Sequence, residues 1–440
     1  MPRQLEASSL SVRANRAIAI NAALWTAGNA LTTGGFLNYF AADLGARGFS
    51  LAILMATPEL VGLSGMASRS LWRWNGDRRR VWLITTLIAR FITFLIPCVG
   101  LFRQSFSPAT VPWVLIGVLV VAQAAQGIAT TLYFSWLADL VPSPDWGRLF
   151  ARRNIAALSI QLVLPILAAW FRDDAKKRFD PATLWWVYAV VFSVGALLLL
   201  ASIWPMLTLP HPQAAPQERS RFHFGALLSL LQNRNVRWLL AHSWCLALAN
   251  GVTQAVFFQY QIRVVKLGLT GYYVMASCMV LLQIVTSAWA GRCRTAADHR
   301  RVLFQSTFIT SLALGFWCLA DAASWWWLFG AFCCWGAFGA VNVAGPNLML
   351  CQAPPGDNAH HLALFRQVAG VVAGISGILG GWWLDHLLAT FANTSVSAFH
   401  LIFVVSWIGR ALAAFFVLGV RPDEVPRSHP DSGRSTAENA

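Results

Sequence analysis

Long apolar stretches dominate this sequence, and each is long enough to cross a lipid bilayer. A transmembrane helix needs roughly 20 mostly apolar residues to span a hydrocarbon core of about 30 Å. Twelve such stretches lie near residues 17–41, 49–70, 81–102, 111–137, 151–171, 183–208, 237–261, 270–291, 302–320, 324–349, 363–388 and 398–420. Strands of a transmembrane barrel are shorter and alternate in polarity, so these stretches indicate helices. The sequence therefore predicts an all-α membrane protein with twelve transmembrane helices.

Composition agrees with a membrane protein and excludes other classes. Hydrophobic residues make up 57% of the chain and charged residues only 12%, more apolar side chain than a soluble protein of 440 residues can bury. The net charge of +15 is spread over many predicted loops and comes with no nucleic-acid motif, so we expect no nucleic-acid partner. The eight cysteines lack the spacing of metal ligands and are expected to pack as small apolar residues. We expect neither a metal nor a cofactor.

The distribution of basic residues predicts the orientation in the membrane. Arg and Lys are retained on the cytoplasmic side of short loops. With the amino terminus inside, most of the 33 Arg and Lys residues fall on the cytoplasmic side. The first apolar stretch lacks a convincing small-residue cleavage site, so it is expected to remain as the first helix. We therefore predict a multi-pass protein of the cytoplasmic membrane with both termini in the cytoplasm.

The two halves of the chain carry a repeated sequence. The segment "NALTTGGFLNY" at 29–39 and the segment "NGVTQAVFFQY" at 250–260 share Asn, Thr, Phe and Tyr at matching positions. The loop "RWNGDRRRV" at 73–81 matches "RTAADHRRV" at 294–302 at the same offset, and charged loops do not match through shared hydrophobicity. An even number of helices per repeat gives two parallel halves related by a pseudo-two-fold axis along the membrane normal.

The repeat divides the chain into two six-helix bundles. Residues 17–208 form the first bundle and residues 237–420 the second. Residues 209–236 are predicted to be a cytoplasmic linker. A cytoplasmic amino-terminal segment, 1–16, precedes the first bundle, and a cytoplasmic tail, 421–440, follows the second. Residues 1–14 and 421–440 are polar and expected to be disordered.

This organisation resembles the major facilitator superfamily of secondary transporters. The resemblance rests on the two sets of six helices and on the arginine-rich loop that recurs after the second and eighth helices. The family's loop motif matches at Arg79 and Arg80, but its acidic residue is displaced to Asp77. Gln123 stands where many relatives have an arginine associated with proton coupling, which puts that coupling route in doubt.

The resemblance implies that the first, fourth, seventh and tenth helices line a central cavity. A polar group in lipid is costly unless it faces such a cavity or another helix, and these helices carry polar side chains at helical spacing. The candidate substrate-binding residues are Asn21, Trp25, Asn29, Thr32, Gln123, Gln126, Thr130, Tyr133, His242, Asn250, Thr253, Gln254 and Asn342. The alternative is that these groups bond across helices as packing contacts worth about 0.6 kcal/mol each.

Three charges lie deep within the predicted helices. Glu59 and Arg90 both fall roughly 15 Å from the cytoplasmic side, at about 1.5 Å per residue, and are candidates for ion coupling. A pair between them is geometrically feasible, and a purely structural salt bridge is the favoured alternative. Arg410 has no evident partner. Arginines and aspartates of the cytoplasmic loops form a candidate gate, with membrane orientation as their alternative role: Arg73, Asp77, Arg153, Arg294, Asp298 and Arg366.

The predicted function is secondary active transport by alternating access. The chain has no phosphate-binding loop and no catalytic motif, so transport is expected to draw on a proton or sodium gradient, and we expect no enzyme activity. A cavity lined by amides, hydroxyls and aromatic rings favours a small neutral polar or amphipathic solute, moved by a monomer. Three alternatives remain: an efflux antiporter for lipophilic compounds, a polytopic membrane enzyme, and a membrane scaffold or sensor that transports nothing.

Overall fold

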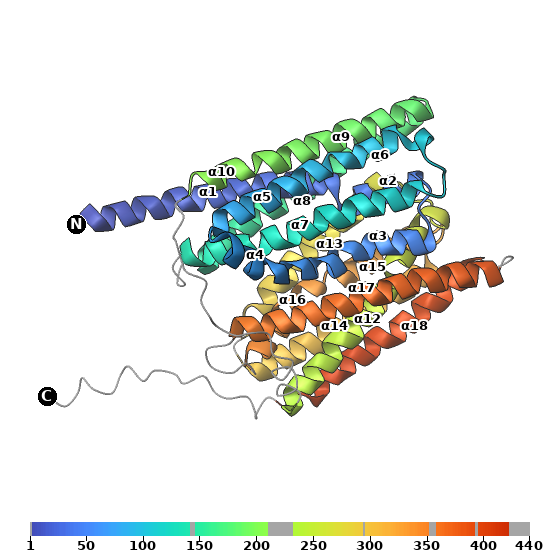
Figure 1. Cartoon of the computed structure of the whole chain (residues 1–440). Coiled ribbons are helices and arrows are strands. Elements are labelled where there is room, and N and C mark those ends of the chain that lie inside the picture. Colours follow the sequence, from blue (N-terminus) through green and yellow to red (C-terminus); the bar gives the residue numbers. More distant parts are fainter. Residues whose placement is uncertain are drawn as a thin grey trace.

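The computed structural model describes residues 2–140, 146–209, 232–293, 295–351, 358–391 and 395–421, and the structural statements below concern these residues. Most of the predicted linker and nearly all of the predicted tail lie outside them. Within the described part, the regular structure is helical throughout and forms a bundle of long helices (Figure 1).

The first half of the chain contains helices that are frequently interrupted. They are α1 (Pro2–Thr32), α2 (Gly34–Asp43), α3 (Gly48–Val61), η1 (Gly62–Ala67), α4 (Ser68–Asn75), α5 (Arg78–Thr93), α6 (Leu95–Leu101), η2 (Arg103–Ser105), α7 (Val111–Leu140), α8 (Trp146–Arg178), α9 (Pro181–Ala201) and α10 (Ile203–Leu207). Helix α1 begins at Pro2, so residues 2–14, which were predicted to be disordered, are helical instead. Proline suits the first turn of a helix, and no glycine or further proline interrupts the following residues.

The helices of the second half are less interrupted. Its helices are α12 (Arg234–Arg263), α13 (Leu269–Ala290), α14 (Ala296–Leu319), α15 (Trp327–Trp335), α16 (Phe338–Cys351), α17 (Asn358–Thr390), α18 (Ser395–Phe416) and η4 (Val417–Gly419). We call the end of the bundle that holds the start of α1 and the end of α18 the terminal face, and the other end the opposite face (Figure 1).

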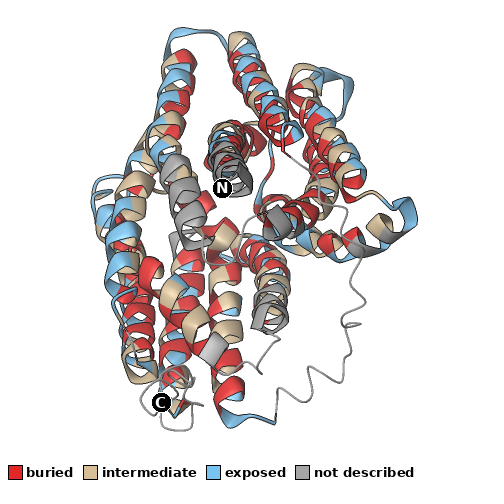
Figure 2. Ribbon diagram, turned by 90° about the vertical axis from the view of Figure 1, so that its left-hand side faces the viewer, coloured by how far each residue is buried: buried red, intermediate tan, exposed pale blue. Residues whose placement is uncertain are grey.

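All twelve predicted stretches fall on helices. Within the described residues, nine helical segments satisfy the length and composition required to cross a membrane. The three remaining stretches lie on α1 with α2, on α8 and on α12. The protein is therefore an all-α membrane protein, as predicted, and its helices are consistent with twelve spans. Exposed residues line the outward sides of the bundle (Figure 2), where large apolar side chains such as Trp204 and Ile408 suit contact with lipid.

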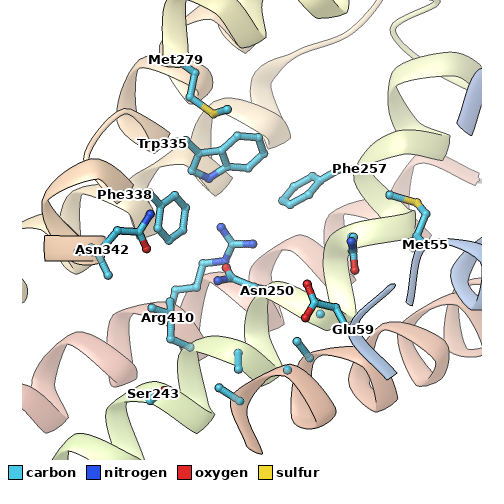
Figure 3. Close-up of a pocket in the computed structure, with 18 of the residues that line it drawn as sticks. Met55, Glu59, Ser243, Asn250, Phe257, Met279, Trp335, Phe338, Asn342 and Arg410 are labelled. Atoms are coloured by element: carbon cyan, nitrogen blue, oxygen red, sulfur yellow. The ribbon is translucent and has the colours of Figure 1, made fainter. Parts of the chain in front are cut away.

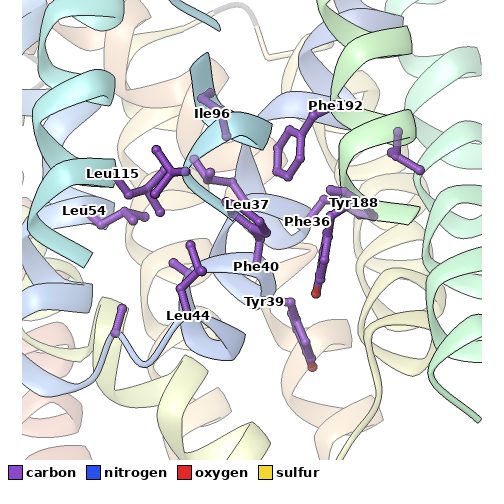
Figure 4. Close-up of a cluster of buried hydrophobic side chains, with 14 of the residues drawn as sticks. Phe36, Leu37, Tyr39, Phe40, Leu44, Leu54, Ile96, Leu115, Tyr188 and Phe192 are labelled. Carbon is purple, nitrogen blue, oxygen red and sulfur yellow. The ribbon is translucent and has the colours of Figure 1, made fainter. Parts of the chain in front are cut away.

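The two copies of the repeated segment occupy equivalent positions in the two cores. Phe36 of α2 packs edge-to-face on Phe192 of α9, with ring centroids 5.3 Å apart (Figure 4). Its repeat counterpart, Phe257 of α12, stacks on Phe403 of α18 at 5.2 Å. In each half, the repeated aromatic residue thus contacts the sixth predicted span of its own half. This equivalence is the packing expected of a parallel duplication.

The first span is broken between α1 and α2. Gly34 has a φ of 61°, a left-handed conformation that a side chain disfavours, and it interrupts the helix there. A Cβ on the next residue, Gly35, would lie only 2.7 Å from the ring of Tyr272 in the second half. The break leaves the amide of Phe36 without a helical partner, and it donates to the hydroxyl of Tyr273 (3.0 Å). Glycines therefore allow the two halves to approach closely at this level.

A polar cluster holds the ends of three helices together at the opposite face. Arg172 of α8 forms an ion pair with Asp43 of α2 and another with its neighbour Asp173. Tyr188 of α9 donates to Asp43 (2.7 Å), and Lys176 lies 3.1 Å from the same carboxylate. Burial alone would raise the pKa of Asp43, but the Arg172 guanidinium, the Tyr188 hydroxyl and the Lys176 ammonium together lower that pKa below its usual value.

Removing the carboxylate of Asp43 should destabilise the first half. We expect Asp43→Asn to lower the free energy of unfolding by about 2 kcal/mol at neutral pH, because the buried Arg172 guanidinium loses an anionic partner. The folded-state pKa of Asp43 is lowered, so its contribution is complete above about pH 4 and is lost as the pH falls through the folded pKa. Thermal unfolding in detergent measures both effects.

The matched control is Asp174→Asn. Asp174 pairs with the largely exposed Arg178 one turn along the same helix, so this substitution should cost no more than about 0.5 kcal/mol. Equal losses in the two variants would contradict a stabilising role for the cluster around Arg172.

Candidate functional site

A cavity of about 1020 Å³ lies between the two halves. The first half contributes residues from α2 and α3, and the second half contributes residues from all of its long helices. The cavity extends from Gln261, near the opposite face, to His242 and Met349 on the terminal side. Figure 3 shows its centre, where polar and aromatic side chains from both halves converge.

Arg410 of α18 is the most unusual residue of this cavity. Its side chain lines the cavity, and the residue is only 2% exposed. Its Nε donates to Oγ of Ser406 (3.2 Å) and its Nη2 donates to Oγ1 of Thr253 (2.9 Å). The guanidinium lies 5.5 Å from the ring centroid of Phe257 and 5.9 Å from that of Trp335. These neighbours orient the guanidinium but are uncharged, so they leave its positive charge without a balancing anion.

Glu59 of α3 brings the opposite charge to the same cavity. It follows Pro58, which lacks an N–H and so interrupts the helical hydrogen bonding there. The residue is exposed and lines the cavity, where one carboxylate oxygen lies close to Gly370 of α17. Among the lining residues, Glu59 is the one that carries a carboxylate.

Aromatic rings form the wall beside Arg410. Phe257 contacts Trp317 (4.6 Å between centroids) and Trp335 (5.0 Å), and Phe338 lines the same region. The indole Nε1 of Trp335 is buried and has no hydrogen-bond partner within the described part of the chain, and the same holds for Oδ1 of Asn250. The wall therefore offers apolar surface, and a buried donor and a buried acceptor without described partners lie in residues that line it.

Five of the predicted site residues line this cavity. Glu59 does, and so do His242, Asn250, Gln254 and Asn342 of the second half. His242 also bonds the carbonyl of Ala413 through Nδ1 (2.9 Å), a contact that fixes its ring against α18.

The polar stripes of the first and fourth predicted helices lie elsewhere, contrary to the prediction. Within the first half, a cavity of about 150 Å³ is lined by Asn21, Trp25, Gln126, Thr130 and Tyr133. The reason is the orientation of each helix about its own axis. Asn21 and Trp25 of α1 face α5, α7 and the start of α10. Nδ2 of Asn21, for example, donates to the carbonyl of Ser202 (2.7 Å), a packing contact of the kind considered as the alternative.

The remaining substrate candidates are dispersed. Gln123 lines a further cavity of about 160 Å³, which borders Asn38 and Gln254. Thr32 is buried and bonds the carbonyl of Gly28 in its own helix, and Thr253 bonds its own helix and accepts from Arg410. Asn29 is half-buried and lines none of these three cavities.

Glu59 and Arg90 do not form the predicted pair. Arg90 lines the small cavity of the first half, is 6% exposed and has an Nε without a hydrogen-bond partner among the described residues. Glu59 faces the central cavity. The two residues were expected to meet because they lie at the same depth in the membrane. Their side chains point into different cavities instead.

The loop aspartates cap helices. Asp77 caps α5, accepting from the backbone N–H of Arg79 (2.9 Å) and Arg80 (3.2 Å). In the second half, Asp298 and Thr295 form a capping box at the start of α14. Capping accounts for the aspartate in both copies of the loop. The side chains of Arg73, Arg153 and Arg366 and the whole of Arg294 lie outside the described residues, so the gate stays a prediction.

Sequence comparison shows the family to which this chain belongs. The family model described as Major Facilitator Superfamily matches residues 17–297, and the chain belongs to this superfamily. It is therefore a multi-pass membrane protein of a transporter family. No curated protein matches the sequence.

Solved structures share its fold at low sequence identity. A variant of the nucleoside transporter NupG is similar with a TM-score of 0.64 and 13% identity, over 93% of this chain and 100% of that chain. A bacterial homologue of the iron transporter ferroportin, in an inward-facing state, has a TM-score of 0.63 and 14% identity, covering 93% and 99%. A D-xylose–proton symporter has a TM-score of 0.60 and 13% identity, covering 93% and 98%.

Thiol labelling should separate the central cavity from the small one. In a variant without native cysteines, we expect Ser243→Cys in the central cavity to react at least about tenfold faster with a water-soluble maleimide than Gln126→Cys in the small cavity. Both residues are half-buried, so their overall exposure does not account for the difference. Equal rates would mean that the polar stripe of α7 also borders the water-filled path.

Proposed function

We propose that this protein is a secondary active transporter that works by alternating access. The observation that carries this proposal is a central cavity between two halves that are joined by hydrogen bonds at one end. In such a machine, the halves rock about the bound solute, and the bonds at each end form and break in turn.

Two exchanged helix caps join the halves at the opposite face. Asp173 of α8 accepts from the backbone N–H and from the hydroxyl of Thr270 (both 2.9 Å), in the first turn of α13. Asp385 of α17 accepts from the backbone N–H of Phe49 (2.7 Å), in the first turn of α3. A carboxylate at a helix N-terminus bonds free N–H groups and interacts favourably with the helix dipole. Each half therefore caps a helix of the other half.

Further contacts close the same end. The Tyr39 hydroxyl donates to the carbonyl of Leu267 (2.8 Å), and the Tyr39 ring packs edge-to-face on Phe258 at 5.1 Å. Together with the exchanged caps, these contacts support a conformation closed at the opposite face.

The cavity supports a solute of low net charge. It combines one carboxylate, one guanidinium, several amides and an aromatic wall, which suits the small polar or amphipathic solute expected from the sequence. Its apolar wall also favours the second candidate, efflux of a lipophilic compound. Membership of a transporter family favours both over an enzyme or a scaffold.

A gradient of protons or sodium ions is the proposed energy source. Gln123 stands where many members of the family have an arginine associated with proton coupling. We therefore propose Glu59, the carboxylate that lines the central cavity, as the coupling residue instead. We further propose that the protein acts as a monomer in the cytoplasmic membrane, with the terminal face toward the cytoplasm.

Breaking both exchanged caps should open the opposite face. Replacing a capping Asp by Ala costs about 1 kcal/mol, so we expect Asp173→Ala with Asp385→Ala to increase the open population about tenfold or more. Gln104, in the short helix η2, and Ala322, in a loop of the second half, are both exposed, and spin labels on Gln104→Cys and Ala322→Cys report the distance between them by pulsed EPR.

The control for this experiment is Asp174→Ala. Asp174 neighbours Asp173 but bonds Arg178 of its own helix, so its loss should leave the distance distribution unchanged. A single distance in every variant, whatever the conditions, would contradict alternating access.

A further inference from the structure

We propose that the central cavity binds a zwitterionic solute with an apolar body. Its carboxylate pairs with Arg410, its ammonium pairs with Glu59, and its apolar part lies against the aromatic wall. This inference rests on the proposed function and specifies the solute for the same cavity.

The first step is the charge of Arg410. A charged group deep in a membrane protein is costly unless it is paired. The hydroxyls of Ser406 and Thr253 and the rings of Phe257 and Trp335 are its neighbours, and none of them is an anion. No carboxylate forms an ion pair with it in the part of the chain that the structure describes. Two neutral hydrogen bonds hold the guanidinium in place and leave further N–H groups for a ligand.

The second step is the charge of Glu59. It is the one lining carboxylate, and no lysine or arginine pairs with it among the described side chains. Figure 3 shows Glu59 and Arg410 reaching into the cavity from different sides, with Asn250 between them in that view. The two charges face one space, yet they form no ion pair with each other. A ligand can therefore bind both at once.

The third step compares ligand charges. A monoanion satisfies Arg410 but is repelled by Glu59 unless a proton neutralises that carboxylate. A monocation meets the reverse problem. A zwitterion neutralises both groups and brings no net charge into the membrane. It therefore agrees with the expectation of a neutral solute and also accounts for the two charges.

The fourth step is the space beside these charges. Phe257, Trp335 and Phe338 present apolar surface next to the guanidinium, and Met55 and Met279 line the cavity as well. Methionine side chains adapt to different apolar shapes. The Trp335 ring lies 5.9 Å from the Arg410 guanidinium, so apolar surface begins directly beside the charge that a carboxylate would pair with. An apolar or aromatic side group on the zwitterion fits these surroundings.

Solutes with and without each charge test this assignment on the purified full-length protein. The probes are L-phenylalanine and the dipeptide L-phenylalanyl-L-alanine, each compared with its N-acetyl form, which removes the ammonium, and its amide, which removes the carboxylate. Isothermal titration calorimetry measures Kd. We expect at least one of the two zwitterions to bind at least about tenfold more tightly than both of its derivatives.

Substitutions assign each charge to its residue. Glu59→Gln should remove the preference for the zwitterion over its N-acetyl form, because the amide no longer repels an anion or attracts an ammonium. Arg410→Lys should retain a preference for the zwitterion over its amide, and Arg410→Gln should abolish it. The matched control is Arg90→Gln, since Arg90 is equally buried but lines the separate small cavity. It should leave all the Kd ratios unchanged.

Glu59 is exposed, so Glu59→Gln provides a test even if the Arg410 variants fail to fold. The proposal is overturned if neither zwitterion binds more tightly than its N-acetyl form, if Glu59→Gln leaves the ratio unchanged for the zwitterion that does, or if neither zwitterion binds at about 10 mM. Any of these results, together with an opening of the opposite face in the spin-label experiment, would reject the solute class and leave alternating access standing.

Discussion

The hydrocarbon core of a membrane offers no water to a polar group, and this constraint determines most of the structure. Each backbone segment that crosses the core is helical, and most buried side-chain hydroxyls bond a carbonyl of their own helix, as Thr32 and Thr253 do. Among the described residues, Glu59 and Arg410, which lie deep in the bundle, line a cavity, and other charges form clusters at the ends of helices, such as Arg172 with Asp43.

The duplication determines how the halves meet. Asp173 and Asp385 lie on the fifth and eleventh predicted spans, and the helix starts that they cap belong to the eighth and second. These are equivalent positions in the two repeats, so the same type of contact occurs twice, once in each direction between the halves. Helix caps suit a reversible contact because each is weak, and water can replace the carboxylate when the face opens.

The sequence was sufficient to predict the spans, the repeat and the family, because all three depend on local composition or on matching segments. The cavity was harder to predict. Helical periodicity correctly grouped Asn21 with Trp25, and Gln126 with Thr130, but it could not show that both groups face the inside of the first half. Depth along the helices placed Glu59 level with Arg90 but carried no information about direction. The surroundings of Arg410 depend on α12 and α15, which are remote in sequence, so no local pattern indicated them.

The positions of the two cavity charges connect solute recognition with movement. Glu59 belongs to the first half and Arg410 to the second, so a solute that pairs with both holds the halves together at the centre. A solute with one charge pairs with one half only, so its charge does not couple the movement of the two halves. Binding energy shifts a conformational equilibrium only when it differs between the two states. The binding energy of a ligand that bridges the halves differs between the two states, because its distances to Glu59 and Arg410 change when the halves rock.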